Sequence, residues 1–193
     1  MLDNLEKYKV ILASGSPRRR ELMVGLGVNY EVRILPDVDE SYPDTLQGEE
    51  IPLYIAKEKA DAYIPMMQPD ELIITAHTIV WLDGEVLGKP RDREDALQML
   101  RTMSGRTHEV FTGVCITTTD WQRSFTAQTE VRFATLSEDE IIYYVDNFKP
   151  MDKAGAYGVQ EWIGFIGVEN ISGSYYNIMG LPVQKLYREL LKV

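Results

Sequence analysis

The segment ASGSPRRREL, residues 13–22, gathers hydroxyl and guanidinium groups at the start of a predicted helix. Ser16 suits the N-cap and Pro17 the first turn, so backbone N–H groups remain at the positive end of the helix dipole. The three arginines that follow oppose that dipole, which normally favours acidic residues. A phosphate accepting from the N–H groups and the guanidiniums would resolve the conflict. The alternative is a surface helix with exposed arginines.

Two lysines lie at positions where the local chain restricts the side chain, one on a predicted helix and one just after a predicted hairpin. Lys59 lies on a predicted helix face with Ile55 and Tyr63, and the alternative to a functional role is a lysine whose stem packs while its ammonium reaches solvent. Lys89 is enclosed by a glycine and a proline, which limits its freedom, and it is either a positioned cation or an exposed surface lysine.

An acidic loop and two histidines offer further candidates. Asp37, Asp39, Glu40 and Asp44 could supply the oxygen ligands that Mg²⁺ prefers, or they are solvated surface acids. His77 lies between a strand signal and a hairpin signal, as a tolerated strand residue or as part of a site. His108, at the start of another predicted strand, we interpret as structural. The sequence contains no Walker A loop, dinucleotide fingerprint, GxSxG elbow or metal-binding His/Cys spacing.

Elements around these residues alternate between strands and helices, which predicts an α/β protein. Strands are expected at 9–13 and 71–76, a hairpin at 79–88 with a type I′ turn, and a long pair of β-rich runs at 108–119 and 124–136. Helices are expected after Ser16, over 49–64, from an Asp92 cap to Gly105, after a Ser137 capping box, and over 182–191. The glycine- and aromatic-rich run between residues 152 and 182 is not resolved into elements.

The chain has 193 residues, 45% of them hydrophobic, and a formal net charge of −10 at pH 7. Its length predicts one domain or two closely joined lobes. The charge argues against a nucleic-acid polymer or a membrane surface as partner, whereas a small anion needs only a local basic cluster. Cys115 is the single cysteine, so there is no internal disulfide. With neither a signal peptide nor an apolar run of about 20 residues, we expect a cytoplasmic protein.

Seven segments occur together in an order and spacing that resemble the Maf family of nucleotide pyrophosphatases. They are ILASGSPRRREL, AKEKA, TAHTIVWLDGEVLGKPRDREDALQML, SGRTHEVFTGV, LSEDEIIYYV, DKAGAYGVQ and GSYYNIMGLP, and the match covers about residues 9–187. The resemblance implies an ITPase-like α/β fold with a mixed sheet, flanking helices and two lobes around a central cleft. It also implies that residues 1–193 form a single Maf-like domain.

The same resemblance implies a reaction and its components. The expected activity is hydrolysis of a nucleoside triphosphate to its monophosphate and pyrophosphate with a divalent cation, Mg²⁺ or Mn²⁺, with Co²⁺ as an alternative. The segment DKAGAYGVQ resembles the branch that acts on dTTP and UTP, and modified pyrimidine nucleotides are further candidate substrates. A homodimer and an association with septum formation are also implied.

Site residues follow from the resemblance by position. It implies phosphate ligands at Ser14, Ser16, Arg18 and Arg19, a metal ligand at Glu40, catalytic residues at Lys59, His77 and Lys89, and substrate choice at Arg18, Thr78 and Gln160.

One position departs from the family pattern. The family reads ADT where this chain reads AHT, so His77 occupies the place of the acid regarded as the proton acceptor. A neutral imidazole can accept a proton but brings no negative charge to hold a metal ion, and it suits Mn²⁺ or Co²⁺ better than Mg²⁺. We therefore expect a weakened or compensated pyrophosphatase. The alternative is a catalytically impaired nucleotide-binding protein that acts in cell-division control.

Overall fold

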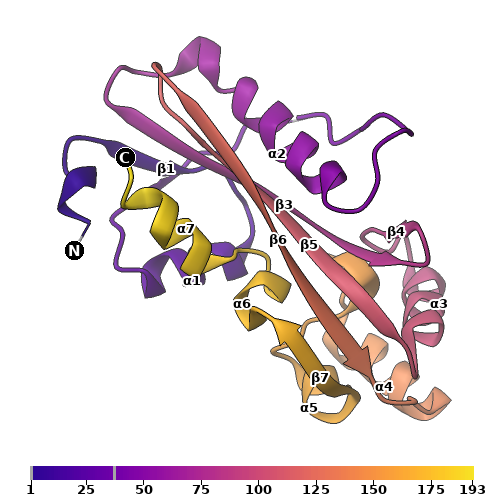
Figure 1. The fold of residues 1–193 in the computed structure, drawn as a ribbon. Coiled ribbons are helices and arrows are strands. Elements are labelled where there is room, and N and C mark those ends of the chain that lie inside the picture. The colour runs from indigo at the N-terminus through magenta and orange to yellow at the C-terminus, as the bar shows by residue number, and fades with distance from the viewer. Residues whose placement is uncertain (1, 37) are drawn as a thin grey trace. The chain divides into compact units, whose positions relative to one another are not determined.

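The computed structural model describes residues 2–36 and 38–193 and contains a mixed sheet with helices packed on it (Figure 1). The strands pair in the order β2-β1-β3-β5-β6-β7, with β4 on β3. Their bounds are β1 Lys9–Leu12, β2 Glu31–Val32, β3 Glu71–Leu82, β4 Glu85–Leu87, β5 Thr107–Thr117, β6 Gln122–Phe133 and β7 Val168–Gly173. β1 runs parallel to β2 and β3, whereas β4 is antiparallel to β3 and β7 to β6. The predicted α/β class with a mixed sheet is confirmed.

The described chain forms two compact units. The first contains the described residues up to His77 together with Thr112–Ala127 and Gly180–Val193, and the second contains Thr78–Phe111 and Gln128–Met179. Helices of the first unit are η1 Asp3–Leu5, α1 Pro17–Gly25, α2 Glu50–Asp61, η2 Ile64–Met66 and α7 Val183–Leu190. Helices of the second are α3 Arg93–Met103, α4 Glu138–Phe148, η3 Ala154–Ala156, α5 Trp162–Gly167 and α6 Tyr175–Ile178.

Helix α2 packs very closely on the strands of the first unit. A Cβ atom added at Gly113 of β5 would lie 2.3 Å from the carbonyl oxygen of Pro52, so only glycine permits this approach. The hydroxyl of Thr75 on β3 donates a 2.6 Å hydrogen bond to the carbonyl of Ala56. These two contacts fix both the position of α2 and its register along β3.

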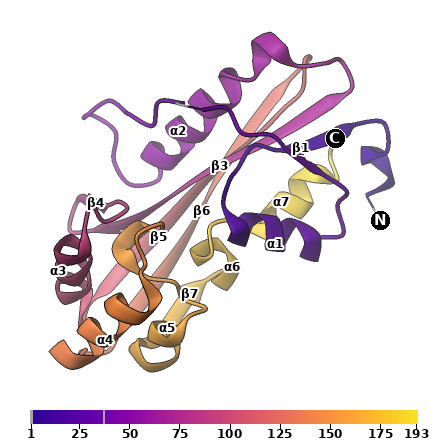
Figure 2. The ribbon, with the colours of Figure 1, turned by 180° about the vertical axis from the view of Figure 1, so that it is seen from behind.

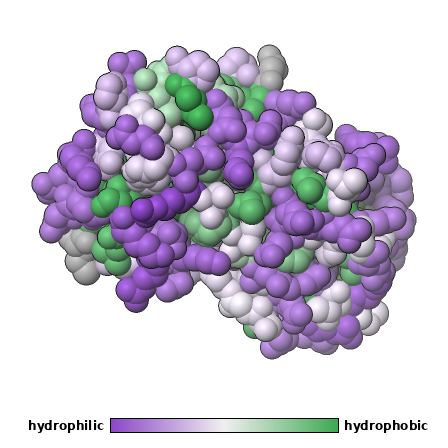
Figure 3. Space-filling model, turned by 45° about the horizontal axis from the view of Figure 1, so that its top comes forward, coloured by the Kyte–Doolittle hydropathy of each residue, from purple (hydrophilic) through white to green (hydrophobic). Residues whose placement is uncertain are grey.

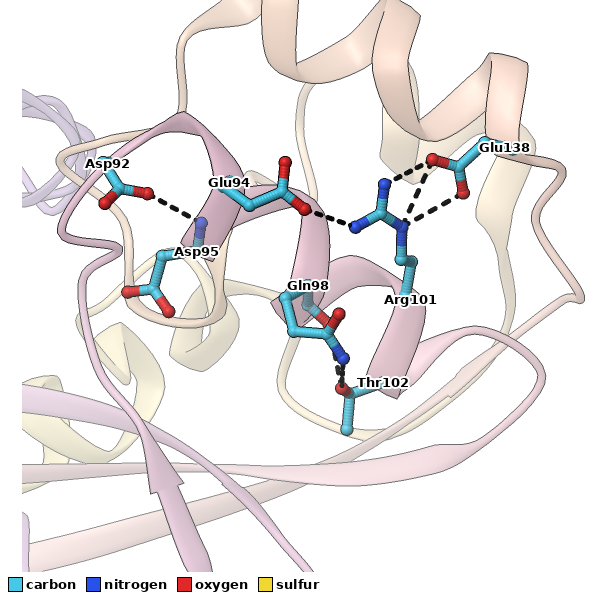
Figure 4. Close-up of polar contacts among 7 residues, drawn as sticks. All are labelled: Asp92, Glu94, Asp95, Gln98, Arg101, Thr102 and Glu138. Atoms are coloured by element: carbon cyan, nitrogen blue, oxygen red, sulfur yellow. Dashed lines mark hydrogen bonds and ion pairs between the residues drawn. The ribbon is translucent and has the colours of Figure 1, made fainter.

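In the second unit, α3 and α4 are joined by an arginine that lies between two carboxylates (Figure 4). Nη1 of Arg101 donates to Glu94 at 2.8 Å, and Nε donates to Oε2 of Glu138 on α4 at 3.1 Å. Asp92 caps α3 by accepting from the N–H of Asp95 at 2.9 Å, as predicted. Helix α3 buries an apolar stripe, which consists of Ala96, Leu97, Leu100 and Met103.

Other local predictions are also confirmed. Asp83 and Gly84 have φ angles of 54° and 86°, as a type I′ turn requires. The strand before that turn is a single element, β3, so the two apolar runs on either side of His77 are continuous. Ser137 forms the predicted capping box with Glu140. The run left unassigned in the sequence contains η3, α5, β7 and α6.

The surface drawn in Figure 3 is mostly hydrophilic, and hydrophobic residues appear on it as small separate groups. Figure 2 gives the reverse view of the ribbon, in which α2 and β3 again lie side by side. Within the part of the chain that the structure describes, no helix has the length and apolar character needed to cross a membrane.

Candidate active site

The loop between β1 and α1 is organised by its own hydroxyl and guanidinium groups. Ser16 caps α1 by accepting a 3.4 Å hydrogen bond from the N–H of Arg19, as predicted. The guanidinium of Arg19 folds back on the loop, where Nη1 donates to Ser14 Oγ at 3.2 Å and Nε donates to the carbonyl of Gly180 at 2.8 Å. Ser14 itself is buried, and it also accepts from the N–H of Ser16 at 3.3 Å. The loop therefore has a set conformation before any ligand binds.

Positive charge is concentrated at this helix N-terminus. The pKa of Arg19 is lowered to about 10, first by burial and then by the neighbouring charge of Arg18, while Glu40 acts in the opposite direction. The guanidinium therefore stays cationic near neutral pH. Arg18 is half-buried beside it. Two guanidiniums at the N-terminus of a nine-residue helix form a site suited to an anion.

Glu40, Lys59 and His77 lie together in the first unit. The ammonium of Lys59 forms an ion pair with Oε1 of Glu40, and Nδ1 of His77 lies 3.8 Å from the same oxygen. That distance is longer than a hydrogen bond between these two atoms. The side chains of Lys59 and His77 are 17% and 18% exposed, and partial burial strengthens interactions between charges.

The packing of α2 explains why these residues meet. Thr75 and His77 point to the same face of β3 because side chains alternate along a strand. Lys59 lies about one helical turn after Ala56. Thr75 bonds to Ala56. His77, the next residue on the same strand face, and Lys59, one helical turn further along α2, therefore come close together. In the burial pattern of β3, His77 is also where the run of fully buried residues ends.

The donors in this group fit a metal ion only in part. Among residues 2–36 and 38–193, no three His, Cys, Asp or Glu side chains are arranged to hold a metal ion. Glu40 and His77 supply two donors, and Mg²⁺ commonly binds through one or two carboxylates and substrate phosphates. The carboxylate of Glu40 therefore fits an ion that a phosphorylated substrate shares. Asp39 accepts from Ser41, and Asp37, another of the acids predicted as ligands, lies outside the described residues.

In the second unit, a buried loop touches the turn that carries Lys89. The backbone N–H of Gly155 donates a 3.0 Å hydrogen bond to the carbonyl of Gly88, the residue before Lys89. A Cβ atom added at Gly155 would lie 2.9 Å from Cγ2 of Val80, so the loop also packs on β3. Gly155 of the segment 153–161 thus contacts both β3 and the residue before Lys89.

The remaining predicted residues lie along this loop or next to it. Thr78 is half-buried on β3, two positions before the valine that contacts the loop, and the side chain of Lys89 is exposed. Gln160 is near the end of the loop. Its Oε1 atom is buried and has no hydrogen-bond partner in the described structure. A buried carbonyl oxygen without a donor is an acceptor available to a ligand.

A buried ionic network in the same loop was missed by the sequence analysis. Lys153 is 7% exposed, and its ammonium bonds to Asp152 at 2.8 Å and to Glu161 at 3.1 Å. The hydroxyl of Tyr144 on α4 donates to Glu161 and accepts from the N–H of Gly158 at 2.9 Å. The sequence signal was a lysine and a glutamate within a run of glycine and apolar residues, where charges are rare unless they are paired.

Comparison with known proteins gives consistent matches. The family described as Maf-like protein matches residues 9–193. A Bacteroides thetaiotaomicron protein named dTTP/UTP pyrophosphatase is 71% identical to this chain over 193 residues, which cover 100% of each chain. A Bacteroides fragilis protein with the same name is 70% identical over 190 residues, which cover 98% of each chain.

A solved structure supports the fold. The Ham1 protein of Staphylococcus aureus matches with a TM-score of 0.54 at 16% identity, over 95% of this chain and 98% of that one. At this low identity the likeness concerns the fold alone. It confirms the expected ITPase-like arrangement of a mixed sheet and flanking helices.

Proposed function

The chain belongs to the Maf-like protein family, and on this basis we propose that it hydrolyses dTTP and UTP to the nucleoside monophosphate and pyrophosphate. The observation that carries the proposal is its identity of 71% over 193 residues with the B. thetaiotaomicron dTTP/UTP pyrophosphatase. An identity this high along the whole chain supports the same reaction in this protein. Modified pyrimidine nucleoside triphosphates are further candidate substrates.

We assign phosphate binding to the loop before α1. Ser14, Ser16, Arg18 and Arg19 supply hydroxyl and guanidinium donors next to backbone N–H groups at a helix N-terminus, which suits phosphate oxygens. The existing bonds of Arg19 to Ser14 and Gly180 hold its guanidinium in place, so it needs little reordering when the phosphate arrives.

The reaction requires a water molecule, a proton acceptor and neutralisation of phosphate charge. The water oxygen forms a bond to the α-phosphorus, the bond from that phosphorus to the bridging oxygen breaks, and pyrophosphate leaves with the electron pair. We assign acceptance of the water's proton to His77, because imidazole is the side chain that most often serves as a general base. Lys59 and Lys89 are assigned to neutralising charge on the phosphates.

A divalent ion is part of this proposal. Glu40 is the side chain that would hold it, with oxygen atoms of the substrate completing its coordination, while the lone pair of His77 stays available for the water's proton. When bound, the ion supplies positive charge next to the phosphate oxygens. Because His77 contributes no negative charge, we propose that Mg²⁺ is held more weakly here than by two carboxylates and that Mn²⁺ or Co²⁺ supports turnover better.

Selection of the base is assigned to Gln160, with Thr78 and Arg18 as further contributors to substrate choice. Uracil and thymine carry an N3–H between two carbonyl oxygens, and a carboxamide can accept from that N–H while donating to a carbonyl. The buried Oε1 atom of Gln160 has no partner, and leaving such an acceptor unsatisfied costs about 1–3 kcal/mol. The N3–H of the base would remove that cost, whereas cytosine has no hydrogen at N3.

A second function is favoured by one observation, the imidazole at position 77. A protein that binds the nucleotide but hydrolyses it too slowly to matter would act by occupancy, for example in cell-division control. Both functions require nucleotide binding, so only turnover distinguishes them.

The deciding experiment measures pyrophosphate release from dTTP, UTP, CTP and ATP, with Mg²⁺ and Mn²⁺ compared, alongside calorimetric binding of each nucleotide. Faster release from dTTP and UTP than from the other two supports the pyrophosphatase. Tight binding of dTTP and UTP without release under either metal supports the binding protein. A cytoplasmic location, where nucleoside triphosphates are found, and a homodimer remain part of the proposal; sedimentation tests the dimer.

A further inference from the structure

The loop 153–161 has an unusual backbone for a buried segment. Apart from the short helix η3, it lacks regular structure, yet residues 155–159 are all buried. Gly155 and Ala156 have φ angles of 67° and 56°, which glycine adopts readily and alanine does not. A backbone of this kind persists only where surrounding contacts determine it. The contacts that determine this backbone therefore also determine where the side chains of the loop, including Gln160, are placed.

One such contact is a hydrogen bond between two buried side chains. Nε2 of His108, at the start of β5, lies 2.7 Å from the hydroxyl oxygen of Tyr157. The two residues are 1% and 5% exposed. Water therefore cannot replace this bond, and each partner would be left unsatisfied if the other were removed.

Aromatic packing holds the same two residues in place. The rings of His108, Tyr157 and Phe133 meet edge to face in all three pairings, with centroids 5.0, 5.3 and 4.9 Å apart. Tyr157 follows directly after the two residues with positive φ and precedes Gln160 by three positions. Fixing its side chain consequently fixes the path of the chain toward Gln160.

The other end of the loop is held by Tyr144 and Lys153, which bond to Gly158 and Glu161 on either side of Gln160. Gln160 lies between these anchors. Its Oε1 atom is buried without a partner, so nothing in the described structure holds that atom except the conformation of the loop. The direction in which this acceptor points is accordingly set by the anchors.

We propose that His108 and Tyr157 are positioning residues for Gln160, and that their hydrogen bond tunes selection of the pyrimidine base without touching the substrate. This inference rests on the function proposed above, and it adds residues that act on substrate choice through the loop. It assigns His108 a role beyond the structural one expected from the sequence.

The test is Tyr157→Phe, which keeps the packed ring and removes the hydroxyl. We expect kcat/KM for UTP to fall about 10-fold, chiefly through KM, and the preference for UTP over CTP to narrow by a similar factor, as loss of a buried hydrogen bond allows. The matched control is Thr129→Val. It removes another buried hydroxyl of the second unit, bonded to Ser174 at 3.1 Å, and should leave the UTP:CTP ratio unchanged.

A double-mutant cycle with Gln160→Ala separates positioning from general destabilisation. If Tyr157 acts through Gln160, Tyr157→Phe should have no further effect on the UTP:CTP ratio once Gln160 is alanine. Effects that multiply, or a UTP:CTP ratio that Tyr157→Phe alone does not alter, would overturn the inference. His108→Gln, which keeps a group able to bond to the tyrosine hydroxyl, should retain more of the preference for UTP over CTP than His108→Phe does.

A measurement that does not depend on turnover keeps this inference distinct from the proposed function. Amide hydrogen exchange in residues 153–161 of the intact protein should accelerate in Tyr157→Phe and not in Thr129→Val. Unchanged exchange would rule out the anchoring role whatever the enzyme does. If the native protein releases no pyrophosphate from any nucleotide, the proposed function fails, and the exchange result still decides whether these residues hold the loop.

Discussion

Nδ1 of His77 lies 3.8 Å from Oε1 of Glu40, the oxygen that also pairs with Lys59. An imidazole at this distance adds no negative charge to that of the carboxylate. An aspartate in its place would put a second negative group beside Glu40, which is unfavourable alone and favourable when a divalent cation lies between them.

His77→Asp is therefore expected to increase pyrophosphate release from dTTP, most clearly with Mg²⁺. A positioned general base is worth about 10²- to 10⁴-fold in rate, so a gain of at least about 10-fold is expected. The melting temperature should be lower than that of the native protein in EDTA and should recover when Mg²⁺ is added. A less stable variant that hydrolyses no faster and does not respond to Mg²⁺ would exclude a catalytic role for this position.

Arg18→Ala is expected to weaken dTTP binding by about 10-fold or more, because a hydrogen bond to a charged group contributes about 1.5–3 kcal/mol. Calorimetric titration measures this change. Arg20→Ala is the matched control, since it removes the same charge from the same helix turn. Equal losses in both variants would mean that overall positive charge, and not a contact from Arg18, attracts the nucleotide.

Gln160→Glu is expected to lower kcat/KM for dTTP and UTP by about 10-fold or more, since the carboxylate loses the amide donor and adds negative charge near an anionic substrate. Gln98→Glu, on the exposed face of α3, provides a control for the added charge. The melting temperature should change little. An equal loss against ATP and CTP would argue that the glutamine is structural and does not read the base.

The stability of the protein should depend on pH through His108. Burial lowers the pKa of His108 from 6.5 to about 4, so the folded protein keeps this imidazole neutral while the unfolded chain protonates it below about pH 6.5. Between these values the unfolded state binds more protons, and stability falls as pH falls, by about 1.4 kcal/mol per pH unit. Above pH 6.5 the imidazole is neutral in both states, so the stability that is lost at lower pH is fully present.

Urea unfolding between pH 5 and 6.5 measures this effect. In that range the native protein should lose stability more steeply than His108→Gln. Carboxyl groups with a lowered pKa, such as Glu71 bonded to Arg33, change stability only below their ordinary pKa of 4.5, and so do not affect the range from pH 5 to 6.5. Parallel curves for the two proteins would contradict a neutral, buried His108.

Local structure was largely predictable from the sequence, because short-range rules decide it. The Ser16 cap and Pro17 define the start of α1, Asp83 and Gly84 define the hairpin turn, and the Ser137 capping box starts α4. Each depends on residues within a few positions of one another. Sequence patterns therefore predict such elements without knowledge of the rest of the chain.

Candidate residues could also be identified from the sequence, because they were chemically out of place. Arginines at the start of a helix, a lysine on an apolar helix face and a histidine inside a strand all conflict with local preference. The family resemblance assigned them roles. What the sequence could not provide was which of them are neighbours.

Tertiary structure alone decided those contacts, since they depend on how α2 lies on β3 and β5. The close approach at Gly113 and the bond from Thr75 to Ala56 bring Lys59 to His77. The conformation of loop 153–161 depends in the same way on contacts from β3 and β5, which are distant in sequence, and from α4, which precedes it. No periodicity or propensity within its glycine-rich run encodes positive φ at Ala156 or the bond from Tyr157 to His108, because long-range packing imposes both.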